Sequence, residues 1–328
     1  MEQLAKPPYV QHVPTDGRQV LLAPYWQEDI GEWIFYVEVA PGQLGPLMGG
    51  APVRADYLGR VAADPLTDFE VPLSTLIVRH LSFPPVMDAL HALETDIHLF
   101  CDILAKYELI SARAKEDHFA VHLAASEVEF LIRVLRSVYD ILQRVVREVS
   151  SLLVTPNTNK KVMQELPRSF ADVALKSAKP CELGELVTKF GMVPALAAFY
   201  VAEAPFFMLL REIRNAIDHY GRDIRLVFDL PNGLAVRVDD QPWRDLAIWN
   251  VPLAHNRLGP LRLVVAYLVS HVLGAIRRFA AVFEGPEFIL PPPIGDFRVF
   301  LKNPYGRNVV RLPDMIKQPW DQPIDTFL

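Results

Sequence analysis

Four long amphipathic segments constrain this chain more than any other feature of its sequence. In the first, apolar residues recur at intervals of three or four: Val86, Leu90, Leu93, Ile97, Phe100, Leu104 and Tyr107. Only a helix places residues with this spacing on one face. Similar spacing predicts helices at about 119–153, 194–220 and 260–283. Helices of this length can pack as a bundle, so the sequence predicts a mainly α fold.

The two ends of the chain have a different composition. Residues 1–84 are rich in proline and glycine, with short β-like runs such as Trp33 to Val37 between turn signals. This pattern predicts an extended or irregular N-terminal arm. Residues 285–328 are proline-rich as well and contain one strand-like run, 297–301, which predicts a largely extended C-terminal tail.

A β-hairpin is predicted between the third and fourth helices. Asn232-Gly233 separates two β-rich runs, and Asn-Gly in this setting is the strongest short hairpin signal. We therefore expect a helical bundle over residues 85–284, with a small hairpin near 224–238, flanked by the arm and the tail.

Composition excludes some classes of protein. The formal net charge is −6, which argues against a protein that coats nucleic acid through a broad basic surface. Two cysteines are too few to staple a chain of 328 residues, and they indicate a reducing compartment. The N-terminus has no secretion signal, and charged residues interrupt the most apolar stretch, 261–283. We expect a cytoplasmic protein that does not contact a membrane.

The richest set of chemical groups lies at the end of the third helix, within residues 206–221. Its polar members are Arg211, Arg214, Asn215, Asp218, His219 and Tyr220. On a helix, Arg211, Asn215 and His219 form one stripe. Arg214 and Asp218 form an adjacent i,i+4 pair. Ile213 and Ile217 are expected to hold this segment to the core.

The segment from Arg214 to His219 resembles the Arg-polar-x-x-x-His signature of the HEPN superfamily. The resemblance implies a HEPN-like helical bundle and, in catalytic members, metal-independent RNA cleavage in which the 2′-hydroxyl attacks the adjacent phosphate. It also implies a homodimer in which two copies of the motif face each other, and an antitoxin-type protein partner. No metal ion or other cofactor is expected.

The resemblance assigns a role to each residue of the cluster. Arg214 would clamp the scissile phosphate, and His219 would be the general acid or base. Asn215 would orient the imidazole or bind a phosphate oxygen, while Arg211, Asp218 and Tyr220 would line the substrate site.

Two other readings of the cluster stay open. A noncatalytic HEPN-like module would use the same residues to bind a nucleotide, an RNA or a protein partner. In a purely structural reading, His219 interacts with the helix dipole, and Arg214 and Asp218 form an ordinary surface ion pair.

The remaining histidines give weaker signals. His118 and His122 have the i,i+4 spacing of some zinc sites, but no second ligand pair accompanies them, which favours a surface pair. His91 and His98 fall on the polar side of the first helix and are expected to be solvated. His271 lies in an apolar helix and is expected to be a core histidine with a hydrogen-bond partner.

Overall fold

The computed structural model describes most of the chain. It covers residues 24–40, 43–71, 84–114, 116–117, 119–150, 166–220, 227–283 and 298–321. All structural statements below concern these residues.

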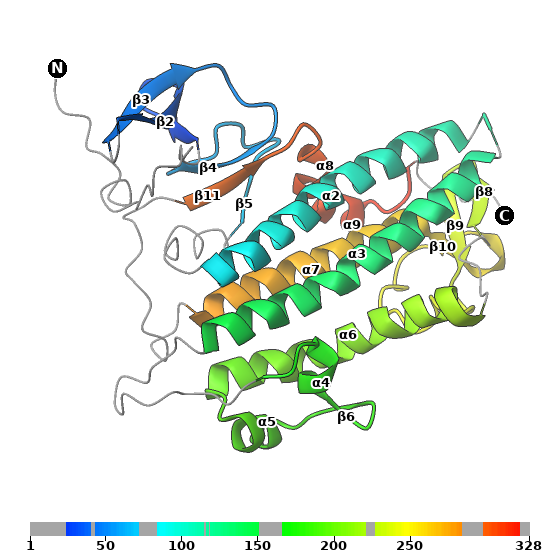
Figure 1. Ribbon diagram of the computed structural model, residues 1–328. Coiled ribbons are helices and arrows are strands. Elements are labelled where there is room, and N and C mark those ends of the chain that lie inside the picture. The colour runs from blue at the N-terminus through cyan, green and yellow to red at the C-terminus, as the bar shows by residue number, and fades with distance from the viewer. Residues whose placement is uncertain are drawn as a thin grey trace.

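Four long helices run side by side through the molecule (Figure 1). They are α2 (Pro84–Ala114), α3 (Phe119–Ser150), α6 (Pro194–Tyr220) and α7 (Leu261–Phe283). Their positions agree with the four predicted segments to within a few residues. Short helices complete the described set: α4 (Phe170–Ala174), α5 (Leu183–Phe190), α8 (Arg307–Val310) and α9 (Leu312–Lys317).

Helix α7 lies at the centre of the fold. It packs against α3, α6, α9 and strand β9 (Gly233–Arg237), and most of its apolar side chains are buried. Among the described helices, α7 is long and apolar enough to cross a membrane, by length and composition. Its burial against four neighbouring elements gives those apolar residues a role in the core.

A six-stranded mixed sheet covers the α2 side of the helices, in the strand order β3-β2-β1-β4-β11-β5. Its strands are β1 (Tyr25–Gln27), β2 (Glu32–Ala40), β3 (Gln43–Gly49), β4 (Ala55–Gly59), β5 (Phe69–Glu70) and β11 (Arg298–Lys302). β1 and β4 are parallel, and the other neighbours are antiparallel. One sheet therefore contains strands from both ends of the chain.

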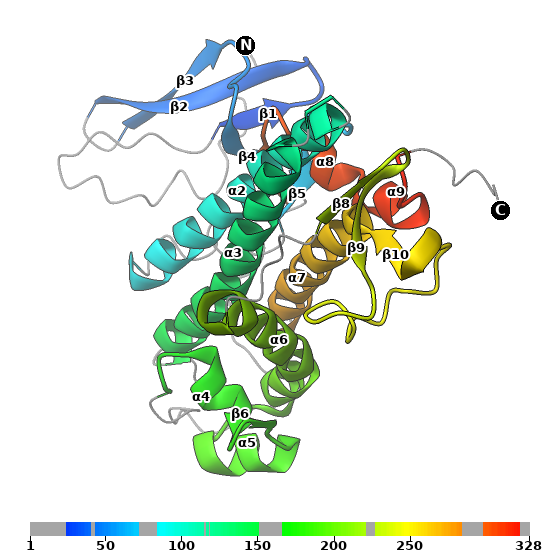
Figure 2. The same ribbon diagram turned by 90° about the vertical axis from the view of Figure 1, so that its right-hand side faces the viewer.

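Two smaller sheets lie elsewhere in the fold. β8 (Val227–Leu230) and β9 form the predicted hairpin, and β10 (Leu258–Pro260) extends it to three strands. β6 (Leu175–Lys176) and β7 (Lys179–Pro180) form a short two-stranded ladder between α4 and α5. Figure 2 shows α4, α5 and β6 together beyond α6, on the side away from the six-stranded sheet.

The predicted fold class was wrong. Three sheets and eight α-helices occur in the described residues, in place of a four-helix bundle with one hairpin and an extended arm. The sheet escaped prediction because β11 must pair with β4 and β5, which lie more than two hundred residues earlier in the sequence. Strands as short as β1 and β5 also carry no readable alternation of their own.

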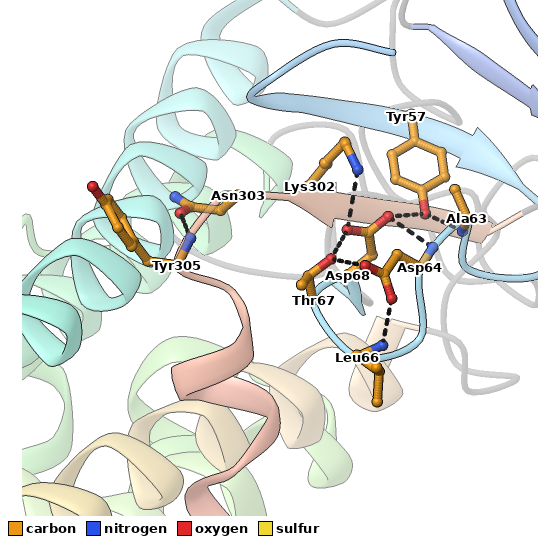
Figure 3. A network of polar contacts seen from close by, with 9 residues as sticks. All are labelled: Tyr57, Ala63, Asp64, Leu66, Thr67, Asp68, Lys302, Asn303 and Tyr305. Atoms are coloured by element: carbon orange, nitrogen blue, oxygen red, sulfur yellow. Dashed lines mark hydrogen bonds and ion pairs between the residues drawn. The ribbon is translucent and has the colours of Figure 1, made fainter. Parts of the chain in front are cut away.

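A buried polar network ties the two ends of the chain together (Figure 3). The carboxylate of Asp68, which is 3% exposed, accepts hydrogen bonds from Tyr57 Oη at 2.8 Å and Thr67 Oγ1 at 2.8 Å. Lys302 Nζ, from β11, lies 3.7 Å from the same carboxylate. The Tyr57 ring stacks on Phe300 of β11 with 5.5 Å between ring centroids. Polar and aromatic contacts thus join β4 to β11.

His98 of α2 contacts the six-stranded sheet. The prediction that His98 is solvated was therefore wrong. His98 is 7% exposed, and its Nδ1 lies 3.1 Å from Asn303 Nδ2. Its Nε2 lies 3.5 Å from a carboxylate oxygen of Asp56 on β4. The polar side of α2 at His98 faces the sheet, which the sequence did not predict. His91, two turns earlier, is exposed as predicted.

Gly306, at the start of α8, permits a close approach between the two ends of the chain. A Cβ atom there would lie 2.0 Å from the carbonyl oxygen of Thr67 and 3.2 Å from that of Asn303. Both obstacles are backbone atoms, so we expect Gly306→Ala to lower the free energy of unfolding by about 1–3 kcal/mol or more. Gly184→Ala in α5 is the control, because nothing lies within 4 Å of the added methyl group. Equal urea midpoints for Gly306→Ala and the wild type would contradict this packing.

Candidate functional site

The predicted Arg/His segment forms the last turns of α6. The helix continues to Tyr220, and Pro205 lies inside it without ending it. Ile213 is buried and Ile217 packs against the main core, so both isoleucines anchor the helix as predicted. Arg211 is exposed, whereas Arg214 and Asn215 are partly buried.

Arg214 and Asn215 are held together. Arg214 Nη2 donates a hydrogen bond to Asn215 Oδ1 at 3.4 Å. The side chains of residues 218–220 lie outside the described part of the structure. The predicted pairing of Arg214 with Asp218 and the predicted contact of Asn215 with His219 therefore remain predictions.

A second cluster of ionisable and polar side chains lies earlier on the same helix, around Glu203. Its side chain is 2% exposed, yet it is an ionisable group in the core between α3, α6 and α7. Arg278 Nε donates to Glu203 Oε1 at 2.7 Å, and Tyr139 Oη donates to Oε2 at 3.1 Å. His271 Nε2 lies 3.6 Å from the same Oε2 atom.

These partners determine the charge of Glu203. Burial would raise the pKa of this carboxyl group, because it penalises the charged form. The contacts with His271 and Arg278, together with the positive charge of Arg278, outweigh burial and lower the pKa below its ordinary value of 4.5. Glu203 is therefore an anion at neutral pH.

His271 connects Glu203 to the surface. Its ring stacks on Phe206 with centroids 3.6 Å apart and an interplanar angle of 9°. The His271 side chain is 29% exposed and lines a cavity of about 510 Å³ between α6 and α7. Glu203 faces His271 as an ion-pair partner at 3.6 Å, which is longer than a hydrogen bond, and His271 is less buried than a core histidine. A histidine positioned by a carboxylate and open to a cavity is a recurrent arrangement at functional sites.

Aromatic packing holds this region rigid. Phe170 of α4 is fully buried, and its ring centroid lies 4.9–5.1 Å from those of Tyr139, Tyr200 and Phe207. The Tyr200 hydroxyl group donates to Gln143, whose amide in turn donates to the carbonyl oxygen of Pro167 at 2.7 Å. The tyrosine that binds Glu203 is thus fixed by rings from α4 and α6.

Sequence reasoning missed Glu203 and Arg278 and did not link His271 to them. A partial signal exists: Glu203 is an acidic residue within the apolar run of α6, and Tyr267, His271 and Arg278 recur at i, i+4 and i+11 on α7. That spacing places the three on one face of a helix. The spacing on α7 does not indicate that Glu203, which belongs to α6, faces these three residues.

Metal binding has no support in the described part of the chain. No group of three or more histidine, cysteine or acidic side chains there could hold an ion. His122 is exposed on α3, and His118 lies outside the described residues. The zinc alternative for this pair therefore stays a sequence-based alternative.

Comparison of this chain with protein-family models, with curated proteins and with solved structures finds no match.

Proposed function

We propose that the protein is a metal-independent endoribonuclease whose phosphate-binding and proton-transfer groups lie at the end of α6. In this proposal Arg214 binds the scissile phosphate and His219 transfers the proton. The 2′-hydroxyl of RNA loses its proton as its oxygen attacks the adjacent phosphorus, the bond to the 5′-oxygen of the next nucleotide breaks, and that oxygen takes up a proton. The products are a 2′,3′-cyclic phosphate and a 5′-hydroxyl end.

The observation that carries the proposal is the continuous helix beneath the Arg-Asn-x-x-x-His segment. Because α6 runs unbroken to Tyr220, it fixes the backbone positions of Arg214 and His219 within one and a half turns. Arg211 is exposed one turn before Asn215, where it can add a second positive charge for a phosphate.

Cleavage of single-stranded RNA in the presence of EDTA tests this proposal. We expect products with cyclic phosphate ends and no cleavage of a DNA strand of the same sequence, which lacks the attacking 2′-hydroxyl group. Arg214→Ala and His219→Ala should each lower the cleavage rate by about 10²–10⁴-fold, as expected for loss of a positioned acid, base or phosphate ligand.

Arg237→Ala is the matched control, because Arg237 is an exposed arginine that belongs to β9 and not to α6. Its rate should equal that of the wild type. Unchanged cleavage after both α6 substitutions, with equal thermal stability, would assign the activity to other residues or to a contaminant.

A second candidate function is phosphate recognition without cleavage. The hydrogen bond from Arg214 to Asn215 favours it, because it already uses one guanidinium donor, and the net charge of −6 disfavours broad contact with RNA. Binding of a nucleotide or short RNA that is lost in Arg214→Ala, with no cleavage by the wild type, would establish this alternative. The homodimer implied by the HEPN resemblance belongs to the ribonuclease proposal, and light scattering of the purified protein tests it.

A further inference from the structure

The cavity between α6 and α7 is separate from the Arg214 segment and has its own chemistry. Its lining comes from α6, α7, strand β7 and the segment between β9 and β10: Pro180, Ala202, Pro205, Phe206, Met208, Leu209, Glu212, Asp245, Tyr267 and His271. Helices α6 and α7 lie next to each other in Figure 2, and they are in contact. The α6 lining extends from Ala202 to Glu212, which is about 15 Å of helix at 1.5 Å per residue.

The charged side chains that line this cavity favour the binding of a cation. Among its described lining residues, the carboxylates of Glu212 and Asp245 are accompanied by no lysine or arginine. Glu203 and Arg278, behind the cavity, neutralise each other across 2.7 Å. The charge carried by the described lining residues is therefore that of the two carboxylates.

The existing partner of Asp245 is weak. Arg244 Nε lies 3.6 Å from Asp245, and both side chains are more than half exposed. Exposed pairs of this kind contribute about 0–1 kcal/mol, so a bound cation can replace this one. Gln241 also donates to Asp245 at 2.8 Å, and this hydrogen bond leaves the carboxylate charge intact.

The walls of the cavity are aromatic and apolar. Phe206 packs against His271 and, edge to face, against Tyr267 with 5.9 Å between ring centroids. Aromatic faces attract organic cations, and methylene chains gain from contact with apolar walls such as Met208 and Leu209. An elongated apolar surface with carboxylates from two different elements matches a linear molecule that carries amines separated by methylene groups.

We propose that this cavity binds a linear aliphatic diamine or polyamine. The ammonium groups pair with Glu212 and Asp245, and the methylene chain lies along α6 against Leu209, Phe206 and Tyr267. The inference does not depend on the ribonuclease proposal, because none of the cavity residues belongs to the Arg214–His219 segment.

Isothermal titration of the full chain, without RNA, tests this site with three probes. Spermidine and 1,6-diaminohexane should bind saturably with one molecule per chain. The uncharged 1,6-hexanediol, which has the same methylene chain, should bind at least tenfold more weakly. Glu212→Gln combined with Asp245→Asn should lower spermidine affinity by tenfold or more.

Asp172→Asn with Asp314→Asn is the matched control, since it removes the same charge from exposed positions on α4 and α9. This control should bind spermidine as the wild type does. Leu209→Lys, which places a cation in the cavity, should abolish binding and gives a second readout if the double variant folds poorly. Absence of spermidine binding, equal affinity for the diol, or equal affinity of the double variant and its control would each overturn the proposal.

Discussion

Replacing Phe170 with alanine is expected to lower the free energy of unfolding by about 3–5 kcal/mol, the range for large-to-small changes at fully buried aromatic positions. Phe170 is 0% exposed and its ring meets three others, on α3 and α6. Its removal leaves a cavity that the surrounding rings cannot fill without moving Tyr139, the hydrogen-bond donor to Glu203.

Phe119→Ala is the matched control for this change. Phe119 begins α3 and is 80% exposed, so truncation of its side chain should alter stability by less than about 0.5 kcal/mol. Urea denaturation monitored by circular dichroism measures both variants. Similar losses in the two would mean that the ring cluster around Phe170 does not hold α4 against α6.

The second large effect is expected at Glu203. Glu203→Ala should lower the free energy of unfolding by about 2–4 kcal/mol, because the buried Tyr139 hydroxyl group loses its acceptor and Arg278 loses its partner. The loss is smaller than for a fully buried ion pair because Arg278 is 50% exposed and can be solvated. Glu203→Gln keeps the shape of the side chain and should cost less, about 1–2 kcal/mol.

Glu212→Ala is the control on the same helix. Glu212 is exposed, so its loss should change stability by less than about 0.5 kcal/mol. A Glu203→Ala variant as stable as Glu212→Ala would mean that the network around Glu203 contributes nothing to the fold.

The contribution of Glu203 to the free energy of unfolding should depend on pH. The pKa of Glu203 in the folded protein lies below its ordinary value of 4.5, so the folded state favours the ionised carboxylate. Its contribution to stability is fully present above the unfolded pKa and is lost as the pH falls through the folded pKa. The stability difference between the wild type and Glu203→Gln should therefore be constant from pH 7 to about 5 and shrink below the ordinary carboxyl pKa. A difference that grows on acidification would contradict this assignment.

Part of the candidate sites could be predicted from the sequence. The polar cluster at residues 211–220 was located on the end of a helix from spacing alone, and the structure places its backbone in α6. Glu203, by contrast, has partners 64 and 75 residues away, on α3 and α7. Nothing in the local pattern of α6 distinguishes this buried anion from a solvated glutamate.

The sequence by itself determined the four long helices, because the apolar spacing that a helix requires continues over 23 to 32 consecutive residues in each. It also determined the hairpin, because the Asn-Gly turn is a local signal. Only the tertiary structure decided the six-stranded sheet, the burial of His98 and the pairing of Glu203 with His271. Each of these depends on which segments meet, and the contacts that decide it join residues far apart in the chain.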